Sequence, residues 1–384
     1  MAQGTFSRRQ FAKRFSAAMG AAVMAPEITK SLAALAAPRL PEGAEGDWIQ
    51  LNANENPYGP SPKAVEAITH SESMASRYPD ELEGRLIAAI AKLHGVEKSN
   101  VMLGCGSGEI LRVADSAFLD AGKKAVVAEP TFEAVLAFAR VMRAEPVKVP
   151  LTADHRHDLR AMLAASGSNA GLIYLCNPNN PTGTIVTREE LADFFSRAPQ
   201  HAIVLVDEAY YHFVEDKRYA SAFEWFGKVP NLVIARTFSK IYGMAGMRLG
   251  YAVAAPNLIR AMSQYALWNR ANTAVLEAAL ACLGDEAHIA DQRKKINGTR
   301  EWLCKELEGD GRRYIPSHAN FVMVDVGGNV EPLIHKFEEK RILVGRKFPS
   351  MGNWLRISVG TPKEMQTFVE TLRALAPAQS AKVA

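Results

Sequence analysis

The stretch VLVDEAYYHF, residues 204–213, ends an aliphatic run with two carboxylates. A short run of this kind is typical of a strand that is buried on both faces of a parallel sheet. Asp207 and Glu208 therefore follow directly on a core strand, where an unpaired carboxylate is costly to bury. We expect a cation to pair with Asp207. The plainest alternative is that Asp207 caps the N-terminus of a following helix.

Three further strand ends carry candidate chemistry, and ligands of open α/β sheets bind at the carboxyl ends of strands. GCGSGEIL (104–111) opens a helix with three glycines, so its backbone N–H groups suit an anion, although it is neither a P-loop nor a G-x-G-x-x-G motif. NPNNPTG (177–183) presents amide side chains from a turn. TFSKIYGMAGMR (237–248) surrounds Lys240 with hydroxyls and an arginine. Taken alone, the glycine stretch is equally consistent with an ordinary strand-to-helix turn, NPNNPTG favours a structural turn, and Lys240 favours a solvated surface loop.

Taken together, the four strand ends match what pyridoxal 5′-phosphate requires. A lysine amine forms a Schiff base with the aldehyde of this cofactor, and a carboxylate keeps its pyridine nitrogen protonated. The glycine turn would bind the phosphate. In this hypothesis Lys240 and Asp207 are the catalytic residues. The pyridinium is then the cation that offsets the desolvation of Asp207.

Six motifs resemble, in order and spacing, those of fold-type I (class I/II) pyridoxal-phosphate-dependent aminotransferases, most of all the histidinol-phosphate aminotransferase group. The motifs are LNANENPYGPSP (51–62), RYPD (77–80), NPNNPTG, DEAY (207–210), TFSKIYGMAGMRLGY (237–251) and WLRISVGT (354–361). The similarity covers residues 48–375. It implies an α/β fold in which a large domain holds a mostly parallel sheet between helices and a smaller C-terminal domain is α+β.

The resemblance also implies roles for individual residues. Lys240 would bond to the cofactor and Asp207 would pair with its ring nitrogen. The other implied cofactor contacts are Ser107, Gly108, Thr237, Ser239 and Arg248 for the phosphate, Asn180 and Tyr210 for the ring oxygen, and Phe132 for the ring face. Tyr78 of RYPD would reach the phosphate site of a neighbouring subunit, which implies a homodimer. No metal is expected.

Two arginines near the C-terminus are candidates for binding the substrate. Alternation along WLRISVG places Leu355 and Ile357 on one face of a strand and Arg356 on the other. In the resembling family this arginine binds a carboxylate or phosphate of the substrate, for which a guanidinium is suited. Without the resemblance, a solvated strand face would explain Arg356. Arg346 of VGRKFP is a candidate second anion contact, although the family pattern at this place is Val-Arg-Asp.

The elements that must position these residues alternate between short apolar strands and amphipathic helices. Strands are expected at 100–104, 124–130, 170–178, 201–209, 231–239 and 248–254, and helices at 109–118, 131–142 and 187–198. This order predicts a mostly parallel sheet with helices on both faces. From residue 285 a long charged helix and further strands predict the smaller α+β domain. We divide the chain into a leader (1–40), an N-terminal arm (41–75), a large cofactor-binding domain (76–280) and a small domain (281–384).

The positive charge of the chain belongs to its first forty residues. These hold six Lys or Arg against Glu27, a balance of +5, whereas the 384-residue chain has a net charge of +4. The remainder is therefore close to neutral, and nucleic-acid binding is not expected. No apolar stretch approaches the ~20 residues of a membrane span. Cys105, Cys176, Cys282 and Cys304 have neither zinc-site nor disulfide-framework spacing.

The leader contains SRRQFAK (7–13) ahead of an Ala-rich segment and resembles a twin-arginine export signal. It predicts a periplasmic location after export. The alternatives are a basic amphipathic tail and a cytoplasmic protein.

The expected reaction transfers an amino group between an amino donor and 2-oxoglutarate, with histidinol phosphate or an aromatic amino acid as the donor. Two alternatives would keep Lys240 and Asp207: a decarboxylase of a phosphorylated amino acid such as threonine phosphate, and an oxidase-type pyridoxal enzyme. A third is the aminotransferase-like module of a transcription regulator. It is disfavoured because no helix-turn-helix pattern precedes the core and the charge outside the leader is near zero.

Overall fold

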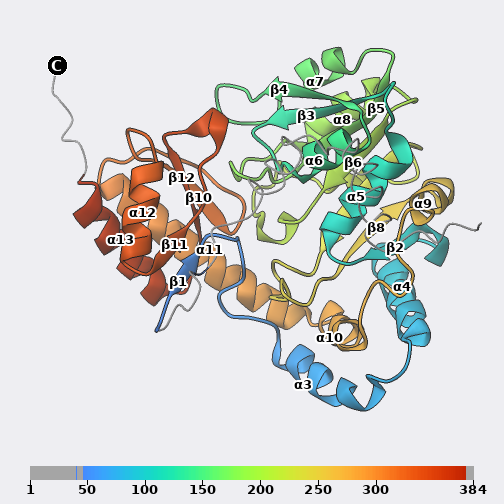
Figure 1. Ribbon diagram of the computed structural model, residues 1–384, viewed down its shortest axis with the longest axis horizontal. Coiled ribbons are helices and arrows are strands. Elements are labelled where there is room, and N and C mark those ends of the chain that lie inside the picture. Colours follow the sequence, from blue (N-terminus) through green and yellow to red (C-terminus); the bar gives the residue numbers. More distant parts are fainter. Residues whose placement is uncertain (1–39, 41–45, 378–384) are drawn as a thin grey trace, which may run out of the picture. The chain divides into compact units, whose positions relative to one another are not determined.

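The computed structural model describes residues 40 and 46–377 (Figure 1). The predicted leader therefore lies, apart from residue 40, outside the described residues. Among the residues that are described, no helix has the length and apolar character needed to cross a membrane.

A seven-stranded sheet forms the larger part of the fold, in the order β2-β8-β7-β6-β5-β3-β4. Its strands are β2 (Val101–Gly104), β3 (Lys124–Glu129), β4 (Glu145–Pro150), β5 (Ala170–Cys176), β6 (Ile203–Asp207), β7 (Leu232–Thr237) and β8 (Gly250–Ala254). Neighbours from β4 to β7 run parallel, whereas β8 is antiparallel to both β7 and β2. The carboxyl ends of β5, β6 and β7 consequently meet at one edge of the sheet.

Helices cover both faces of this sheet, as expected for strands that are apolar on both sides. One face packs against α5 (Ser107–Phe118), α6 (Ala134–Val141) and α9 (Pro256–Ser263). The opposite face packs against α7 (Leu159–Ser166) and α8 (Arg188–Arg197), and near β2 and β8 against α4 (Asp80–His94) and α10 (Thr273–Leu283). Short helices are α3 (Pro62–His70), η1 (Ser71–Met74), η2 (Lys98–Asn100), η3 (Tyr211–Phe213) and η4 (Ala222–Trp225).

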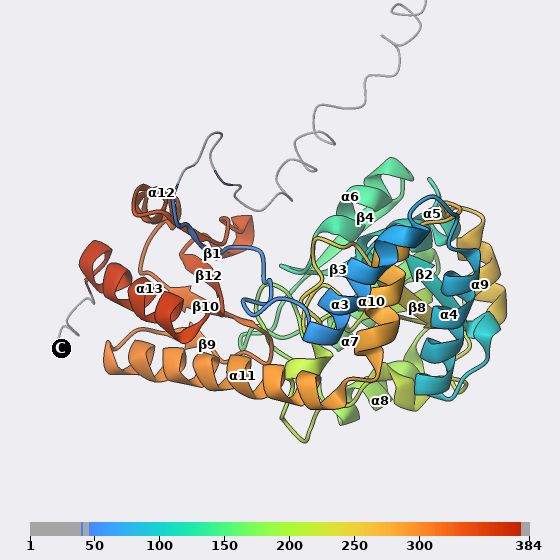
Figure 2. The same cartoon turned by 90° about the horizontal axis from the view of Figure 1, so that it is seen from below.

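The C-terminal part has a sheet of its own. Strands β9 (Tyr314–Ile315), β10 (Phe321–Asp325) and β12 (Trp354–Ser358) pair antiparallel, and β1 (Ile49–Leu51) pairs in parallel with β11 (Ile342–Val344). Helices α11 (Glu286–Gly309), α12 (Glu331–Glu339) and α13 (Pro362–Leu375) accompany them, with η5 (Pro349–Met351) ahead of β12. Figure 2 shows α11 as a long helix that runs from α10 to this C-terminal part.

The predicted fold class is confirmed: a mostly parallel sheet lies between helices, and an α+β part follows. Element ends differ by a few residues. The helix expected from residue 131 begins at Ala134, because Thr131 is tied to Asn179 through its hydroxyl. The proposed division into domains at residues 40, 75 and 280 remains a prediction.

Candidate active site

Asp207 is the last residue of β6 and is 3% exposed. The Tyr174 hydroxyl donates to Asp207 Oδ2 at 2.9 Å, and the Ala209 backbone N–H donates to Oδ1 at 3.1 Å. Burial raises the pKa of Asp207 to about 6, although these two hydrogen bonds and the Lys240 charge lower it. The alternative role as a helix cap is wrong, since the next helix, η3, is preceded by Tyr210.

The neighbouring acid, Glu208, has a partner within the chain. Arg236 Nη2 lies 2.7 Å from Glu208 Oε2, and both side chains are almost fully buried. The Ser221 hydroxyl and the Ala222 N–H also donate to this carboxylate, at 2.9 Å and 2.6 Å. Glu208 is thus satisfied by the fold, and Asp207 is the acid left for a ligand.

Lys240 follows β7 in a loop and points toward the N-terminal arm. Its Nζ donates to the backbone oxygens of Asn54, at 2.9 Å, and Ala53, at 3.2 Å. Burial lowers the pKa of Lys240 to about 8, and the positive charge of Arg356 lowers it further, against the raising influence of Glu55 and Asp207. An amine with this pKa is neutral often enough at physiological pH to act as a nucleophile or general base.

A cradle of backbone and side-chain donors forms where α5 begins. Gly106 precedes the helix at φ 76°, and a Cβ atom there would lie 2.3 Å from Arg248 Nη2. A Cβ atom on Gly250 would lie 2.3 Å from the backbone nitrogen of Ser107, so β8 also closes on this turn. Only glycine permits these approaches. They bring Arg248 against the N-terminal turn of α5, which also holds Gly108.

The hydroxyl groups expected at this cradle come from the end of β7. Thr237 pairs with Gly250 across β7 and β8, and the Thr237 hydroxyl donates to Ser239 Oγ at 2.9 Å. A helix N-terminus, two hydroxyls and a guanidinium together make a phosphate-binding set.

The remaining predicted residues form one polar network around Tyr210. Asn180 Nδ2 lies 3.4 Å from the Tyr210 hydroxyl, and Asn54 Nδ2 donates to the same oxygen at 3.0 Å. Arg356 Nη1 donates to Asn180 Oδ1 at 2.7 Å, and its Nη2 donates to the Asn52 backbone oxygen at 2.7 Å.

Arg356 lies on a buried face of β12, so the alternative of a solvated strand face is wrong. It is 7% exposed, whereas Leu355 and Ile357 point into the C-terminal core. Burial lowers the pKa of Arg356 to about 10, while Tyr210 raises it and the charge of Arg346 lowers it by smaller amounts. No carboxylate among the described residues forms an ion pair with this guanidinium.

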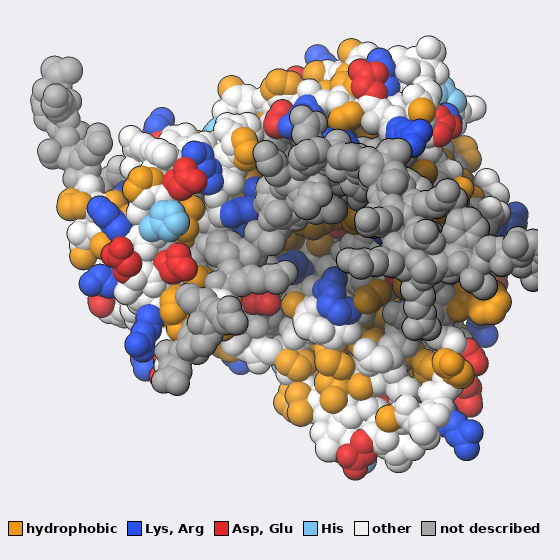
Figure 3. All heavy atoms as spheres, viewed as in Figure 1, with side chains coloured by type: hydrophobic (Ala, Val, Ile, Leu, Met, Phe, Trp, Pro, Cys, Tyr) orange, Lys and Arg blue, Asp and Glu red, His pale blue; other side chains and the backbone are white. Residues whose placement is uncertain are grey.

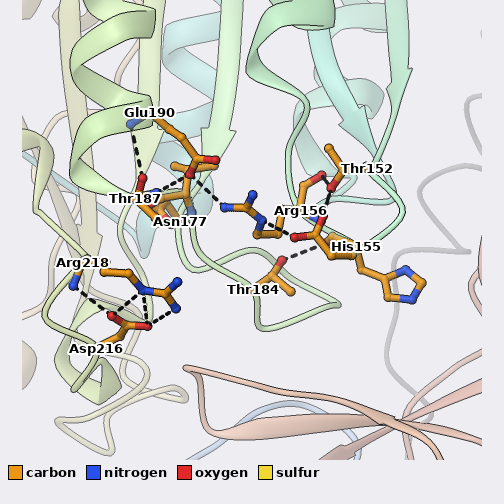
Figure 4. A network of polar contacts seen from close by, with 11 residues as sticks. Thr152, His155, Arg156, Asn177, Thr184, Thr187, Glu190, Asp216 and Arg218 are labelled. Atoms are coloured by element: carbon orange, nitrogen blue, oxygen red, sulfur yellow. Dashed lines mark hydrogen bonds and ion pairs between the residues drawn. The ribbon is translucent and has the colours of Figure 1, made fainter.

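Figure 4 shows a polar network that includes Asn177 and Thr184, the residues that flank the loop with Asn180. The Thr184 hydroxyl donates to the His155 backbone oxygen at 2.8 Å. Next to it, Arg156 bridges Asp154, at 2.6 Å, and Glu190, at 2.9 Å. At the other end of the loop, the Val186 N–H donates to Asn177 Oδ1 at 3.1 Å, so both ends of the segment that carries Asn180 are held by hydrogen bonds.

Phe132, Arg346 and Tyr78 differ in their placement. Phe132 is half-buried and follows Thr131, whose hydroxyl donates to Asn179 at 2.8 Å, so it lies beside the Asn180 loop. Arg346 forms an ion pair with Glu133. Tyr78 is 80% exposed.

The prediction from sequence missed two contributors to the site. The backbone oxygens of residues 52–54 receive Arg356 and Lys240, and the alternating asparagines of NANEN were the available signal. Tyr174 supports Asp207 from the neighbouring strand. Cys176 pairs with Asp207 across β5 and β6, so alternation puts Tyr174 on the same face as the acid.

The donor set fits pyridoxal phosphate. A buried acid that forms no ion pair with any of the described residues suits a pyridinium, and the turn at Gly106 with Arg248 suits a phosphate. Lys240 lies in the same site, because its Nζ is 5.6 Å from the centre of the Tyr210 ring and bonds to the backbone oxygen of Asn54, whose side chain donates to Tyr210.

Comparisons with known proteins agree with this chemistry. The family model described as aminotransferase class I and II matches residues 46–372. The chain is 38% identical over 333 residues to a histidinol-phosphate aminotransferase of Moorella thermoacetica, covering 86% of each protein. It is 37% identical over 321 residues to an aromatic amino acid aminotransferase of Rhodococcus jostii, covering 84% of this chain and 88% of that protein.

A solved structure agrees as well. The histidinol-phosphate aminotransferase from Sinorhizobium meliloti, in complex with pyridoxal-5′-phosphate, superposes with a TM-score of 0.80 at 28% identity. The match covers 85% of this chain and 92% of that one.

Proposed function

Since the chain belongs to the class I and II aminotransferases, we propose that it transfers an amino group between histidinol phosphate or an aromatic amino acid and 2-oxoglutarate. It is a pyridoxal-phosphate-dependent transaminase. The names of the similar proteins from Moorella and Rhodococcus support the two kinds of amino donor. The observation that carries the proposal is the placement of Lys240, with a pKa of about 8, 5.6 Å from the ring of Tyr210, which follows the buried acid Asp207 by three residues.

Pyridoxal phosphate, when bound, supplies a covalent anchor for the substrate amine and an electron sink for the bonds at its Cα. Asp207 would hold the protonated ring nitrogen and Tyr210, with Asn180, the ring oxygen. Phe132 would lie on the ring face. The phosphate would be bound by Ser107, Gly108, Thr237, Ser239 and Arg248.

The chain's own residues then perform the proton transfer. Lys240 Nζ would move the proton between the substrate Cα and the cofactor carbon C4′, which its lowered pKa allows near neutral pH. Arg356 binds the carboxylate of an amino or keto acid, or the phosphate of histidinol phosphate, because its buried charge has no acid partner of its own among the described residues. The apolar cluster of Phe348 and Met351, with Trp354 packed against it, lies close by and suits an aromatic or imidazole side chain.

The test is a panel of amino donors with 2-oxoglutarate and the purified protein loaded with cofactor. We expect glutamate to form with histidinol phosphate, phenylalanine or tyrosine, and Lys240→Ala to abolish it. Release of CO₂ without glutamate would replace transamination by decarboxylation, because the two reactions differ only in which Cα bond is broken.

We further propose that the protein is a homodimer in which Tyr78 reaches the phosphate site of the partner subunit. Tyr78 is 80% exposed and Val65 of α3 is 48% exposed. Figure 3 shows hydrophobic side chains gathered on the face that carries α3. Sedimentation should give the mass of a dimer, and Tyr78→Phe should weaken cofactor binding. A monomer with full cofactor affinity would contradict this proposal.

A periplasmic location is also proposed, on the support of the twin-arginine-like stretch SRRQFAK. Replacing both arginines, Arg8→Lys with Arg9→Lys, should retain the protein in the cytoplasm of a host with this export route. The control is a fused reporter carrying the unaltered leader. If the two versions are distributed alike between cytoplasm and periplasm, the leader is a basic tail.

A further inference from the structure

An ion pair beside the proposed substrate site joins the C-terminal part of the chain to the part that holds the seven-stranded sheet. Arg346, which follows β11, pairs through Nη2 with Glu133, which directly precedes α6. The Arg346 side chain is 19% exposed and that of Glu133 is 24% exposed. A dissolved substrate can therefore reach a pair that is otherwise largely shielded from water.

Arg346 and Arg356 approach the same aromatic ring. The Cζ atom of Arg346 lies 4.3 Å from the centre of the Phe348 ring, and that of Arg356 lies 5.4 Å from it. The two charges sense one another, because Arg346 lowers the pKa of Arg356. The two guanidinium groups therefore form a pair of anion positions set apart by one aromatic ring.

The two positions differ in what occupies them. Arg356 donates to the side-chain oxygen of Asn180 and a backbone oxygen, which are neutral. Arg346, in contrast, has a carboxylate of the chain against it, that of Glu133. One position is thus open to a substrate anion and the other is filled by an internal one.

We propose that Glu133 is an internal counter-ion of Arg346 that a substrate with two anionic groups displaces and a substrate with one leaves in place. This inference rests on the proposed function, in which Arg356 binds the substrate carboxylate. The two half-reactions make different demands, since an aromatic amino acid carries one anionic group, whereas 2-oxoglutarate carries two. If the Glu133 carboxylate can move away from Arg346, the same site can bind both the substrate with one anionic group and the substrate with two.

Arg346 keeps its position when Glu133 leaves. Its guanidinium stacks on Phe348, and its Nη1 donates to the Lys347 backbone oxygen at 3.1 Å, contacts that do not involve the acid. A partly exposed ion pair is worth about 1 kcal/mol, so the competition by Glu133 weakens the second anion contact about fivefold.

The experiment measures binding of two unreactive analogues to the cofactor-loaded protein. Glutarate carries two carboxylates and 3-phenylpropionate carries one. Glu133→Gln should lower the dissociation constant of glutarate about fivefold and should change that of 3-phenylpropionate by less than about twofold. Arg346→Gln should weaken glutarate alone. The matched control is Glu331→Gln, which neutralises the partner of Lys347, 3.1 Å away and one residue beyond Arg346.

The inference fails if Glu133→Gln changes the affinity for both analogues by the same factor or weakens the binding of glutarate. It fails likewise if the control Glu331→Gln tightens the binding of glutarate as much as Glu133→Gln does. It also fails if Arg346→Gln leaves glutarate unchanged. These results are separate from a failure of the proposed function. If the proposed function is wrong, neither analogue competes with the amino donor in the unaltered protein, and no glutamate forms from 2-oxoglutarate.

Discussion

Tyr174→Phe offers a sharp test of how the sheet supports Asp207. The phenol donates to Asp207 Oδ2 at 2.9 Å, and both groups are buried. The substitution removes one donor from a carboxylate and leaves the ring in place. Because the hydrogen bond favours the ionised acid, its loss must raise the pKa of Asp207.

The size of the change follows from the burial of the pair. A net hydrogen bond to a charged group is worth about 1.5 kcal/mol, which corresponds to about one pKa unit. The pKa of Asp207 is about 6 without a ligand, so we expect about 7 in the variant. The ionised fraction then falls about twofold at pH 7, about fivefold at pH 6 and close to tenfold at pH 5.

The assay is the dissociation constant of pyridoxal phosphate, measured by equilibrium dialysis from pH 5 to pH 8. The acid limb of the binding curve should move to higher pH in Tyr174→Phe. The matched control is Tyr251→Phe, since Tyr251 is also buried in the sheet but its hydroxyl lies 3.0 Å from His94. An unmoved acid limb in Tyr174→Phe would refute the electrostatic role given to Asp207.

Three further substitutions test other features of the fold and site. Glu208→Gln leaves the Arg236 cation buried without a charged partner, and it should lower the free energy of unfolding in urea by about 3–5 kcal/mol. Asp115 on α5 is fully buried, and neither carboxyl oxygen has a hydrogen-bond partner among the described residues. Burial raises the pKa of Asp115 well above 3.8 in the folded protein. The unfolded chain therefore releases this proton at a lower pH than the folded chain does. The free energy of unfolding then falls as the pH rises, by up to about 1.4 kcal/mol per pH unit. The melting temperature of Asp115→Asn should therefore exceed that of the unaltered protein by more at pH 8 than at pH 5. An equal difference at the two pH values would contradict this. Gly106→Ala would place a Cβ against Arg248 at a positive φ, and it should weaken cofactor binding about tenfold in dialysis.

The residues at the edge of the large sheet were predictable because they require only the order of the strands. Asp207 and Thr237 each end a strand, and Lys240 follows three residues after Thr237. Consecutive parallel strands end at the same edge, so an apolar run followed by a polar group is enough to place each one. The antiparallel direction of β8 was not predictable, since a run buried on both faces reads the same in either direction.

Contacts between distant parts of the chain leave no local pattern. Asn54 bonds to Ser358 across 304 positions, and Lys240 reaches the Asn54 backbone across 186. The pair of Arg346 and Glu133 spans 213 positions. Alternation correctly put Arg356 opposite Leu355, but no property of a single segment says which distant carbonyl or carboxylate meets it.

The charges of the site explain why a dipolar ligand suits it better than a simple anion. Arg248 and the start of α5 attract a phosphate, whereas the buried Asp207 repels negative charge. A free phosphate ester would bind at Arg248 and the start of α5 and would leave Asp207 without a cation. The cost of burying Asp207 unpaired, which raises its pKa to about 6, would then not be offset. A ligand with a phosphate at one end and a basic ring nitrogen at the other satisfies both ends at once. Because the fold already pairs Glu208 with Arg236, Asp207 is left to select for that nitrogen.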